Sequence, residues 1–416
     1  MAAKKLQVGW YGLGSMGKPM AENLQKYLAK NDQSLIFNNR TMASGDSLKG
    51  LGASPASSFG ELVTKSDVIF TMVNNDDTLK SLLQQAYDTK DLSGKIFVDC
   101  STVHPDTTKA VTEEITKHKA TYLAAPMFGG PAIAVPGKLV VAIGGPSSAV
   151  ETVKPYFQDV IARKVIVCKE EPQSASMLKI AGNIITVNLM EAVSEAQVFA
   201  EQTGIGCDPM EELITEGFGP VAGGYSGRMT SGNYAPALDK RPGFGVSLSI
   251  KDANYALAIA EEKGVKLPAT EIANKNMKAA RDEHGEVLDC ASMYGTLRKE
   301  AGLNFFNDKS RQSDDQRQNA THVHRQEDNT RAQRSSAVCL SRLSNSAGVR
   351  KTGGNPRLAV SIVSRSTMTA LSDIGMTRAM VKEAMARVSG GAVAGQGATV
   401  TVDSPRSDYQ SSSFMA

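Results

Sequence analysis

The chain has 416 residues, 41% of them hydrophobic, and a formal net charge of +3, so it can bury two ordinary hydrophobic cores with sequence left over. Its five cysteines are scattered without a CxxC pair or a Cys/His metal spacing, so nothing suggests structural zinc, and the pattern is typical of reduced intracellular thiols. No uninterrupted apolar stretch approaches the roughly 18 residues of a membrane span.

The N-terminal stretch "MAAKKLQVGWYGLG" passes from two lysines directly into an apolar run. It leaves no room for a signal or transit peptide. We therefore expect a soluble, cytoplasmic protein that acts neither on membranes nor on nucleic acid.

The first 172 residues alternate short β-rich runs with helical patterns, the arrangement that builds a parallel sheet. The sequence predicts strands at 5–12, 33–39, 67–73 and 94–101, with helices at 15–30, 58–65, 76–87 and 147–160. We expect the runs 120–127 and 138–145 to extend the same sheet and 164–168 to close it. This part is therefore predicted to be a doubly wound α/β domain over residues 1–172.

After Pro172 the pattern becomes helical. A long helix is predicted over 174–202, ending at "TGIG", where glycine follows the last helical residue. Helical spacing recurs over 249–265 and 268–283. We predict an all-helical domain over residues 173–306.

The strongest local signal is "GWYGLGSMGKPMAENL", in which Gly12, Gly14 and Gly17 form GxGxxG between the first strand and the first helix. A dinucleotide-binding Rossmann turn needs glycines there for a tight turn, close approach to a pyrophosphate and close helix packing. Free N–H groups at the helix start would hold the phosphates. An incidental glycine-rich turn is the alternative, but both flanks have the expected pattern.

The second strand ends in "IFNNRT", where NAD-binding proteins carry an acidic residue that binds the ribose. Asn39 and Arg40 occupy this place, followed by Thr41. Because a guanidinium can pair with a 2′-phosphate, this segment favours NADP(H), with NAD possible.

Five motifs in this order resemble the β-hydroxyacid dehydrogenase family, which includes 3-hydroxyisobutyrate dehydrogenase and, more distantly, 6-phosphogluconate dehydrogenase. They are "GLGSMGKPMAENL", "DCSTVHP", "APMFGGPAIAVPGKL", "KIAGN" and "SIKDANYALAIAEEKGVKLP", which span nearly all of residues 6–305. The resemblance implies hydride transfer between a nicotinamide and a short hydroxy acid or carbonyl compound, in a homodimer or homotetramer.

By this resemblance, Lys179 is the catalytic acid/base, and Asn183, one helical turn later, binds substrate. An ammonium can protonate the oxygen that receives the hydride, and partial burial would lower its pKa towards neutrality. A lysine snorkelling from a core helix is the alternative. Gly182 leaves room either for a ligand or for close packing.

Further roles follow from the same resemblance. The cofactor side is predicted to include Leu13, Met16, Val73, Asn74, Thr102 and Lys251, and Ser101 is expected to face the nicotinamide or the substrate. The alternative for Lys251 is a solvated lysine at a helix start, and an acid such as Asp252 would be expected at a helix start even if it had no function.

One segment departs from the family pattern. Where many members have Asp-Ala-Pro-Val-Ser-Gly-Gly, this chain reads "AAPMFGG", with Ala124 for the aspartate and Phe128 for the serine, while Gly129 and Gly130 are kept. An aromatic wall replaces a hydroxyl donor. The substrate is therefore expected to be bulkier or less polar, or to bind its carboxylate through backbone amides alone.

These features predict an NADP(H)-preferring β-hydroxyacid dehydrogenase or aldehyde reductase. Two alternatives stay open: a dinucleotide-binding regulatory or scaffold protein with little turnover, and a reductase of bulkier carbonyls or imines. Lys179 favours an enzyme, because scaffold relatives of this kind lose the lysine. A sugar-phosphate substrate is disfavoured by the short helical part, which has no basic cluster.

Residues 307–416 form a polar, basic tail in which arginine replaces lysine as the main cation. Its composition is typical of disorder, apart from one amphipathic helix predicted between Ser372 and Gly390. The tail is either a flexible appendage for an acidic partner or out-of-frame sequence in a predicted gene product. His322 and His324 have no companion ligands, so no metal site is expected.

Overall fold

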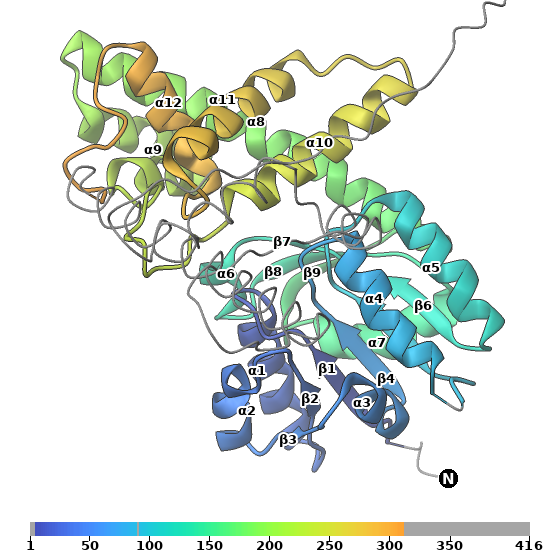
Figure 1. Ribbon diagram of the computed structural model, residues 1–416. Coiled ribbons are helices and arrows are strands. Elements are labelled where there is room, and N and C mark those ends of the chain that lie inside the picture. Colours follow the sequence, from blue (N-terminus) through green and yellow to red (C-terminus); the bar gives the residue numbers. More distant parts are fainter. Residues whose placement is uncertain (1–4, 90, 312–416) are drawn as a thin grey trace, which may run out of the picture. The chain divides into compact units, whose positions relative to one another are not determined.

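The computed structural model of the protein describes residues 5–89 and 91–311 (Figure 1). All of the described residues belong to one compact unit. Residues 312–416 of the predicted basic tail, including its helix after Ser372 and the pair His322 and His324, lie outside the described residues.

Six strands form a parallel sheet in the order β3-β2-β1-β4-β5-β6. The strands are β1 (Val8–Tyr11), β2 (Ile36–Asn38), β3 (Ser54–Pro55), β4 (Val68–Thr71), β5 (Ile96–Asp99) and β6 (Thr121–Ala124). The chain winds outwards in both directions from β1 and β4, which places the crevice for a ligand at the carboxyl ends of these two strands. The predicted doubly wound α/β architecture is confirmed.

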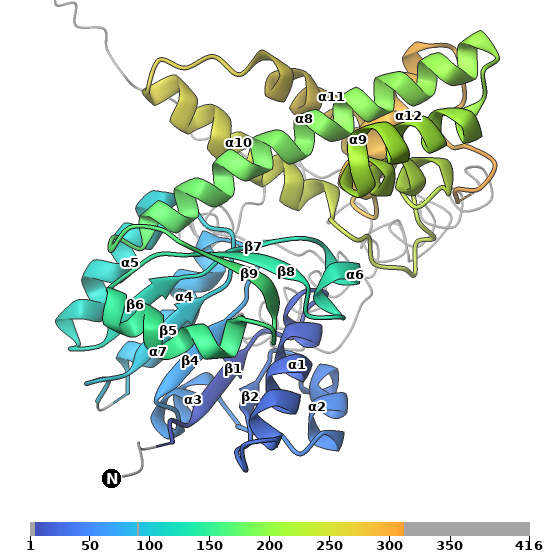
Figure 2. The same ribbon diagram turned by 180° about the vertical axis from the view of Figure 1, so that it is seen from behind.

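Helices cover both faces of this sheet. The core on one face includes α1 (Gly17–Ala29), α2 (Asp46–Gly50) and α7 (Ser147–Phe157), and α7 lies in front of the sheet in Figure 2. The opposite face packs against α3 (Phe59–Lys65), α4 (Asp76–Tyr87) and α5 (Pro105–Lys117). In β4, Val68 and Phe70 face the first core and Ile69 the second, as the two-residue period of a strand requires.

The sheet does not continue beyond β6 as the sequence analysis expected. Instead, β7 (Met127–Phe128), β8 (Leu139–Ile143) and β9 (Ala162–Val167) form a separate three-stranded sheet, with α6 (Pro131–Ala134) between β7 and β8. Pro126 follows β6 and has no N–H to donate, so it cannot extend the ladder. Its carbonyl accepts the Ala142 N–H at 3.0 Å instead, which starts the pairing of β7 with β8.

The helix α8 (Gln173–Thr203) joins the two parts of the fold. Its first turns contact the sheet part: Ala175 belongs to a sheet core, and the hydroxyls of Ser176 and Thr108 lie 2.8 Å apart. Its later turns, including Val187 and Met190, belong to the helical core. The helix ends at Gly204, whose φ of +78° is the left-handed conformation that glycine favours.

The remaining helices pack around the second half of α8. They are α9 (Cys207–Thr230), α10 (Val246–Glu262), α11 (Pro268–His284) and α12 (Met293–Glu300), and single 3₁₀ turns occur at Met42–Gly45 and Cys290–Ser292. Helix α9 breaks at Gly219, where φ is +87°, next to Pro220. The sequence analysis located α10 and α11 but gave no boundaries for α5, α9 or α12.

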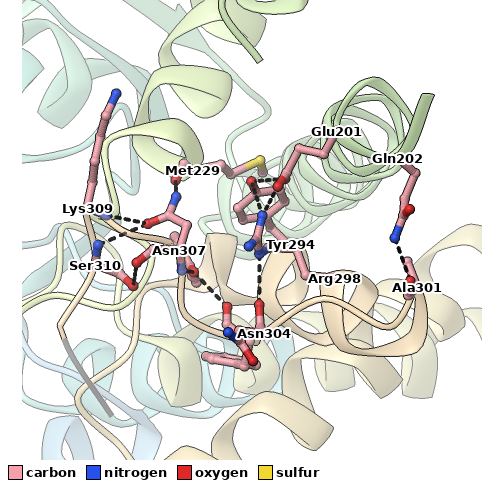
Figure 3. Close-up of polar contacts among 12 residues, drawn as sticks. Glu201, Gln202, Met229, Tyr294, Arg298, Ala301, Asn304, Asn307, Lys309 and Ser310 are labelled. Carbon is pink, nitrogen blue, oxygen red and sulfur yellow. Dashed lines mark hydrogen bonds and ion pairs between the residues drawn. The ribbon is translucent and has the colours of Figure 1, made fainter. Parts of the chain in front are cut away.

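Polar contacts fix the last described segment against the helices (Figure 3). The Arg298 guanidinium pairs with Glu201 of α8, and its Nε donates to the Asn304 carbonyl at 2.9 Å. Further along, Asn307 Nδ2 donates to the Met229 carbonyl at 3.0 Å. The backbone is therefore held against the helical part beyond residue 306.

Candidate active site

The glycine turn between β1 and α1 has the geometry of a phosphate cradle. A Cβ on Gly12 would lie 2.0 Å from the Met72 carbonyl oxygen, and one on Gly17 would lie 2.0 Å from the Gly12 oxygen. A Cβ on Gly14 would meet nothing within 4 Å. Two glycines are thus required by the fold itself, whereas Gly14 leaves open space in front of the helix.

The N-terminus of α1 is open to an anion. No side chain caps it at Met16, and its first turn contains no acidic residue. By contrast, Asn75 caps α4 and Ser58 caps α3. Free N–H groups and the positive end of the helix dipole are what a pyrophosphate needs, so these residues fit a dinucleotide.

The segment after β2 supports this turn. The Leu13 N–H donates to Asn39 Oδ1 at 2.9 Å, and Asn39 Nδ2 donates to the Thr41 carbonyl at 2.8 Å. Asn39 therefore holds the two loops together, while Arg40 is exposed. The roles of Leu13, Met16, Asn39, Arg40 and Thr41 towards a cofactor stay predictions.

Ser101 is buried, and its hydroxyl is engaged within the protein. It donates to Asp99 Oδ1 at 2.6 Å and accepts the Val73 N–H at 2.9 Å. Asp99 also accepts from Thr71, and burial raises the pKa of its carboxyl. The hydroxyl donor is thus unavailable to a ligand, so a substrate-binding role for Ser101, still a prediction, would have to use its backbone.

Lys179 lies on the face of α8 where the sheet part and the helical part meet. Its Nζ donates to Asn183 Oδ1 at 3.0 Å, as the i,i+4 spacing predicts. Burial lowers the lysine pKa from 10.5 to about 8, Lys251 adds to this effect, and the Asp252 carboxylate opposes it. Lys179 can therefore exchange a proton near neutral pH, which general acid/base catalysis requires.

Asp252 completes a charged network that the sequence analysis did not recognise. Asn183 Nδ2 donates to Asp252 Oδ2 at 2.6 Å, and Lys251 Nζ lies 3.0 Å from Asp252 Oδ1. The alternative that these two residues mark a helix start is wrong, because α10 begins at Val246 and Asp252 is 3% exposed. Asp252 thereby fixes the amide orientation that points Asn183 Oδ1 at Lys179.

Lys251 reaches from the helical part to the sheet part. Its ammonium donates to the Thr102 carbonyl, next to Ser101 at the end of β5. One turn later in α10, the Tyr255 hydroxyl donates to Asp76 at the start of α4. These contacts bring Thr102, Lys251 and Asp252 together, whereas Asn74 is exposed after β4.

Phe128 ends β7 beside the lysine. The Lys179 ammonium lies 4.6 Å from the centroid of its ring. A Cβ on Gly182 would lie 2.2 Å from Cε1 of the same ring, so Gly182 makes room for Phe128. Gly129 follows with a φ of +115°, and a Cβ on Gly130 would meet nothing within 4 Å.

The sequence offered little signal for Asp76, Asp252 and Tyr255. Helix-start acids are common, and only the tertiary fold pairs Tyr255 with Asp76, 179 positions apart.

Among residues 5–89 and 91–311, no group of three or more His, Cys, Asp or Glu side chains could hold a metal ion. Within the same ranges no helix is long and apolar enough to cross a membrane.

Two family matches cover most of the described chain. Residues 7–169 match the NAD-binding domain of 6-phosphogluconate dehydrogenase. Residues 174–297 match the NAD-binding region described for NADP-dependent 3-hydroxyisobutyrate dehydrogenase. The two matches meet between β9 and α8.

Individual relatives agree with these matches. The chain is 30% identical over 297 residues to 2-hydroxy-3-oxopropionate reductase of Escherichia coli (strain K12), covering 70% of this chain and 97% of that protein. It is 28% identical over 293 residues to NADH-dependent oxidoreductase ucdB of Aspergillus ustus, covering 70% and 98%. The structure of 3-hydroxyisobutyrate dehydrogenase (ygbJ) from Salmonella typhimurium shares the fold, with a TM-score of 0.62, 23% identity and coverage of 70% and 99%.

Proposed function

Because this chain belongs to the β-hydroxyacid dehydrogenase family and carries its NAD(P)-binding domains, we propose that it is an NADP(H)-preferring dehydrogenase or aldehyde reductase with Lys179 as acid/base. The observation that carries the proposal is the cluster in which the buried Asp252 and Asn183 orient a half-buried lysine whose pKa is lowered to about 8. The assignment to residues 1–172 of cofactor binding and to residues 173–306 of substrate binding is part of this proposal.

A bound nicotinamide would supply or accept the hydride. In the direction of reduction, the Lys179 ammonium donates a proton to the substrate oxygen, and in oxidation its free amine takes the hydroxyl proton. Asn183 holds the lysine in place and can itself contact the substrate oxygen. Lys251, fixed to Asp252 and to the Thr102 carbonyl, keeps α10 against the end of β5.

The substrate class follows from Phe128, Gly129 and Gly130. The open backbone at Gly130 can offer N–H groups to a carboxylate, while Phe128 supplies an apolar wall in place of a hydroxyl. We assign a short β-hydroxy acid, aldehyde acid or keto acid as substrate. A reductase of less polar carbonyl compounds, including bulkier ones or imines, is the second candidate, and the Phe128 ring favours it.

The preference for NADP(H) rests on Arg40. No carboxylate follows β2 to repel a 2′-phosphate, and the exposed Arg40 can pair with one bidentately. Burial raises the pKa of the Tyr11 phenol at the end of β1, and the Arg40 charge opposes this. The A. ustus relative is named as NADH-dependent, so the two cofactors must be compared directly.

We further propose that the chain forms a homodimer or homotetramer in the cytoplasm. Helices α8 and α9 leave large apolar side chains exposed, including Phe199 at 63% and Phe218 at 72%. Such surfaces are typical of association sites. Four cysteines in the described residues are free thiols, in keeping with a reducing compartment.

The test is a steady-state screen of the full chain with NADPH and NADH against short aldehyde acids, keto acids and matching ketones. We expect faster turnover with NADPH, and a Lys179→Ala variant should lose at least about a hundredfold in kcat, the scale of a general acid. Lys275→Ala, at an exposed lysine of α11, is the control and should keep its activity. For reduction, kcat/KM should fall as pH rises through about 8, where Lys179 loses its proton.

Cofactor binding without turnover of any substrate would favour a regulatory or scaffold protein. An equally active Lys179→Ala variant would exclude the acid/base role while leaving the family assignment intact. Turnover of ketones but not of keto acids would favour the second candidate.

A further inference from the structure

The Phe128 ring lies against two positions of α8 that are one turn apart. Lys179 Nζ lies 4.6 Å from its centroid, and Gly182 faces its edge so closely that a Cβ would come within 2.2 Å of Cε1. Positions i and i+3 of a helix share a face. The ring therefore occupies the space that a side chain at position 182 would fill, directly beside the ammonium.

We propose that the face of the Phe128 ring is a binding platform for the Lys179 ammonium, which it holds in its charged form and in position, and that Gly182 is the residue that admits the ring. Phe128 is thus a positioning residue for the acid/base. The effect of Phe128 on catalysis rests on the proposed function, whereas its effect on the position and pKa of Lys179 does not.

The physical basis is the negative electrostatic potential over an aromatic face. A cation within about 6 Å of a ring centroid is attracted by it, and more strongly where water is excluded. Lys179 also meets the charges of Asp252 and Lys251 on α10, which raise and lower its pKa respectively, while burial lowers it most. The ring therefore acts with Asp252 against the cost of burying the ammonium.

Replacing the ring by an aliphatic side chain of similar size should remove this support. In Phe128→Leu we expect the pKa of Lys179 to fall by about half to one unit, the shift that corresponds to a partly desolvated cation–π contact. In Phe128→Tyr the aromatic face is kept, so the pKa should stay within about 0.2 units of the wild-type value. Both variants keep the apolar wall.

Gly182→Ala tests the same contact from the helix. Its methyl group should push the ring off the ammonium and lower the lysine pKa in the same direction as Phe128→Leu. Gly224→Ala is the matched control, because Gly224 also lies in a helix but a Cβ there would meet nothing within 4 Å. It should leave the lysine unchanged.

The measurement is an NMR titration of the full chain labelled with ¹³C,¹⁵N-lysine, with the Lys179 signal assigned by its loss in Lys179→Arg. A lowered pKa in Phe128→Leu and Gly182→Ala, with Phe128→Tyr unchanged, supports the proposal. Equal pKa values in all variants, or an equal fall in Phe128→Tyr, overturn it.

This titration needs no turnover, so it separates the two proposals. If Lys179→Ala keeps its activity but the titration shows the expected shifts, the platform exists and the catalytic role fails. If an active enzyme shows no shift, the platform alone is excluded. Should Phe128→Leu fail to fold, Gly182→Ala and Phe128→Tyr still decide the outcome.

Discussion

Two glycines of the turn after β1 should respond differently to the same substitution. Gly12→Ala places a methyl group 2.0 Å from the Met72 carbonyl oxygen and imposes a φ of +98° on an L-residue, which should cost at least about 2 kcal/mol of unfolding free energy. Gly14→Ala meets nothing within 4 Å, so its unfolding free energy should change by less than about 0.5 kcal/mol. Urea unfolding of the cofactor-free protein measures both.

Although Gly14→Ala should hardly change stability, we expect it to weaken cofactor binding. The methyl group of Gly14→Ala would lie where a pyrophosphate must approach, so we expect a loss of at least about tenfold in NADPH affinity, equivalent to about 1.4 kcal/mol. Calorimetric titration of Gly14→Ala against the wild-type chain measures this. Unchanged affinity in a stable Gly14→Ala variant would show that the open space in front of α1 is not the phosphate site.

At the scale of one helix, α8 contains a buried carboxyl group, that of Glu191, which the proposed mechanism does not use. Its Oε1 accepts from Asn276 Nδ2 of α11, while its Oε2 is buried and has no hydrogen-bond partner among the described residues. Burial raises the pKa of this carboxyl from 4.5 to about 7. Because the folded state holds the proton more tightly, stability should fall as pH rises from about 4.5 to about 7 and stay lower above it.

Glu191→Gln keeps an acceptor for Asn276 and removes the charge, so it should stabilise the protein at pH 8 by about 1–2 kcal/mol. At pH 5 it should have little effect, because Glu191 is then protonated. Glu212→Gln, at an exposed acid of α9, is the control. Urea unfolding at both pH values decides the matter, and equal effects of the two substitutions would contradict a buried charge at position 191.

Local patterns were enough for most elements of the sheet part, for three of the helices after it and for contacts within one helix. The hydrogen bond from Lys179 to Asn183 follows from helical spacing, and the glycine turn follows from its flanking strand and helix. Asp252 was misread because its partner Asn183 is 69 positions away, and nothing in the local pattern shows that α10 begins at Val246. The break of the sheet after β6 likewise depends on which strand the chain meets beyond Pro126.

At the scale of the whole molecule, α8 connects the predicted cofactor and substrate parts. Together with neighbouring helices it exposes apolar side chains. Apolar side chains more than half exposed occur on α8, α9 and α11: Ile185, Phe199, Leu213, Phe218, Val221 and Ile272. Single exposed apolar residues are common on monomers, whereas several large ones on packed helices indicate an interface. We therefore expect the full chain to sediment as a dimer or tetramer at micromolar concentration.

Phe218→Asp tests this expectation most directly, because Phe218 is 72% exposed and its replacement should not disturb the fold of one chain. A charge in the middle of an apolar interface is costly to bury, so the variant should sediment mainly as a monomer. Val135→Asp, at a side chain 65% exposed on the sheet part, is the matched control and should keep the wild-type assembly. A monomeric wild-type chain, or an unchanged assembly in Phe218→Asp, would show that this helical surface is not where copies of the chain meet.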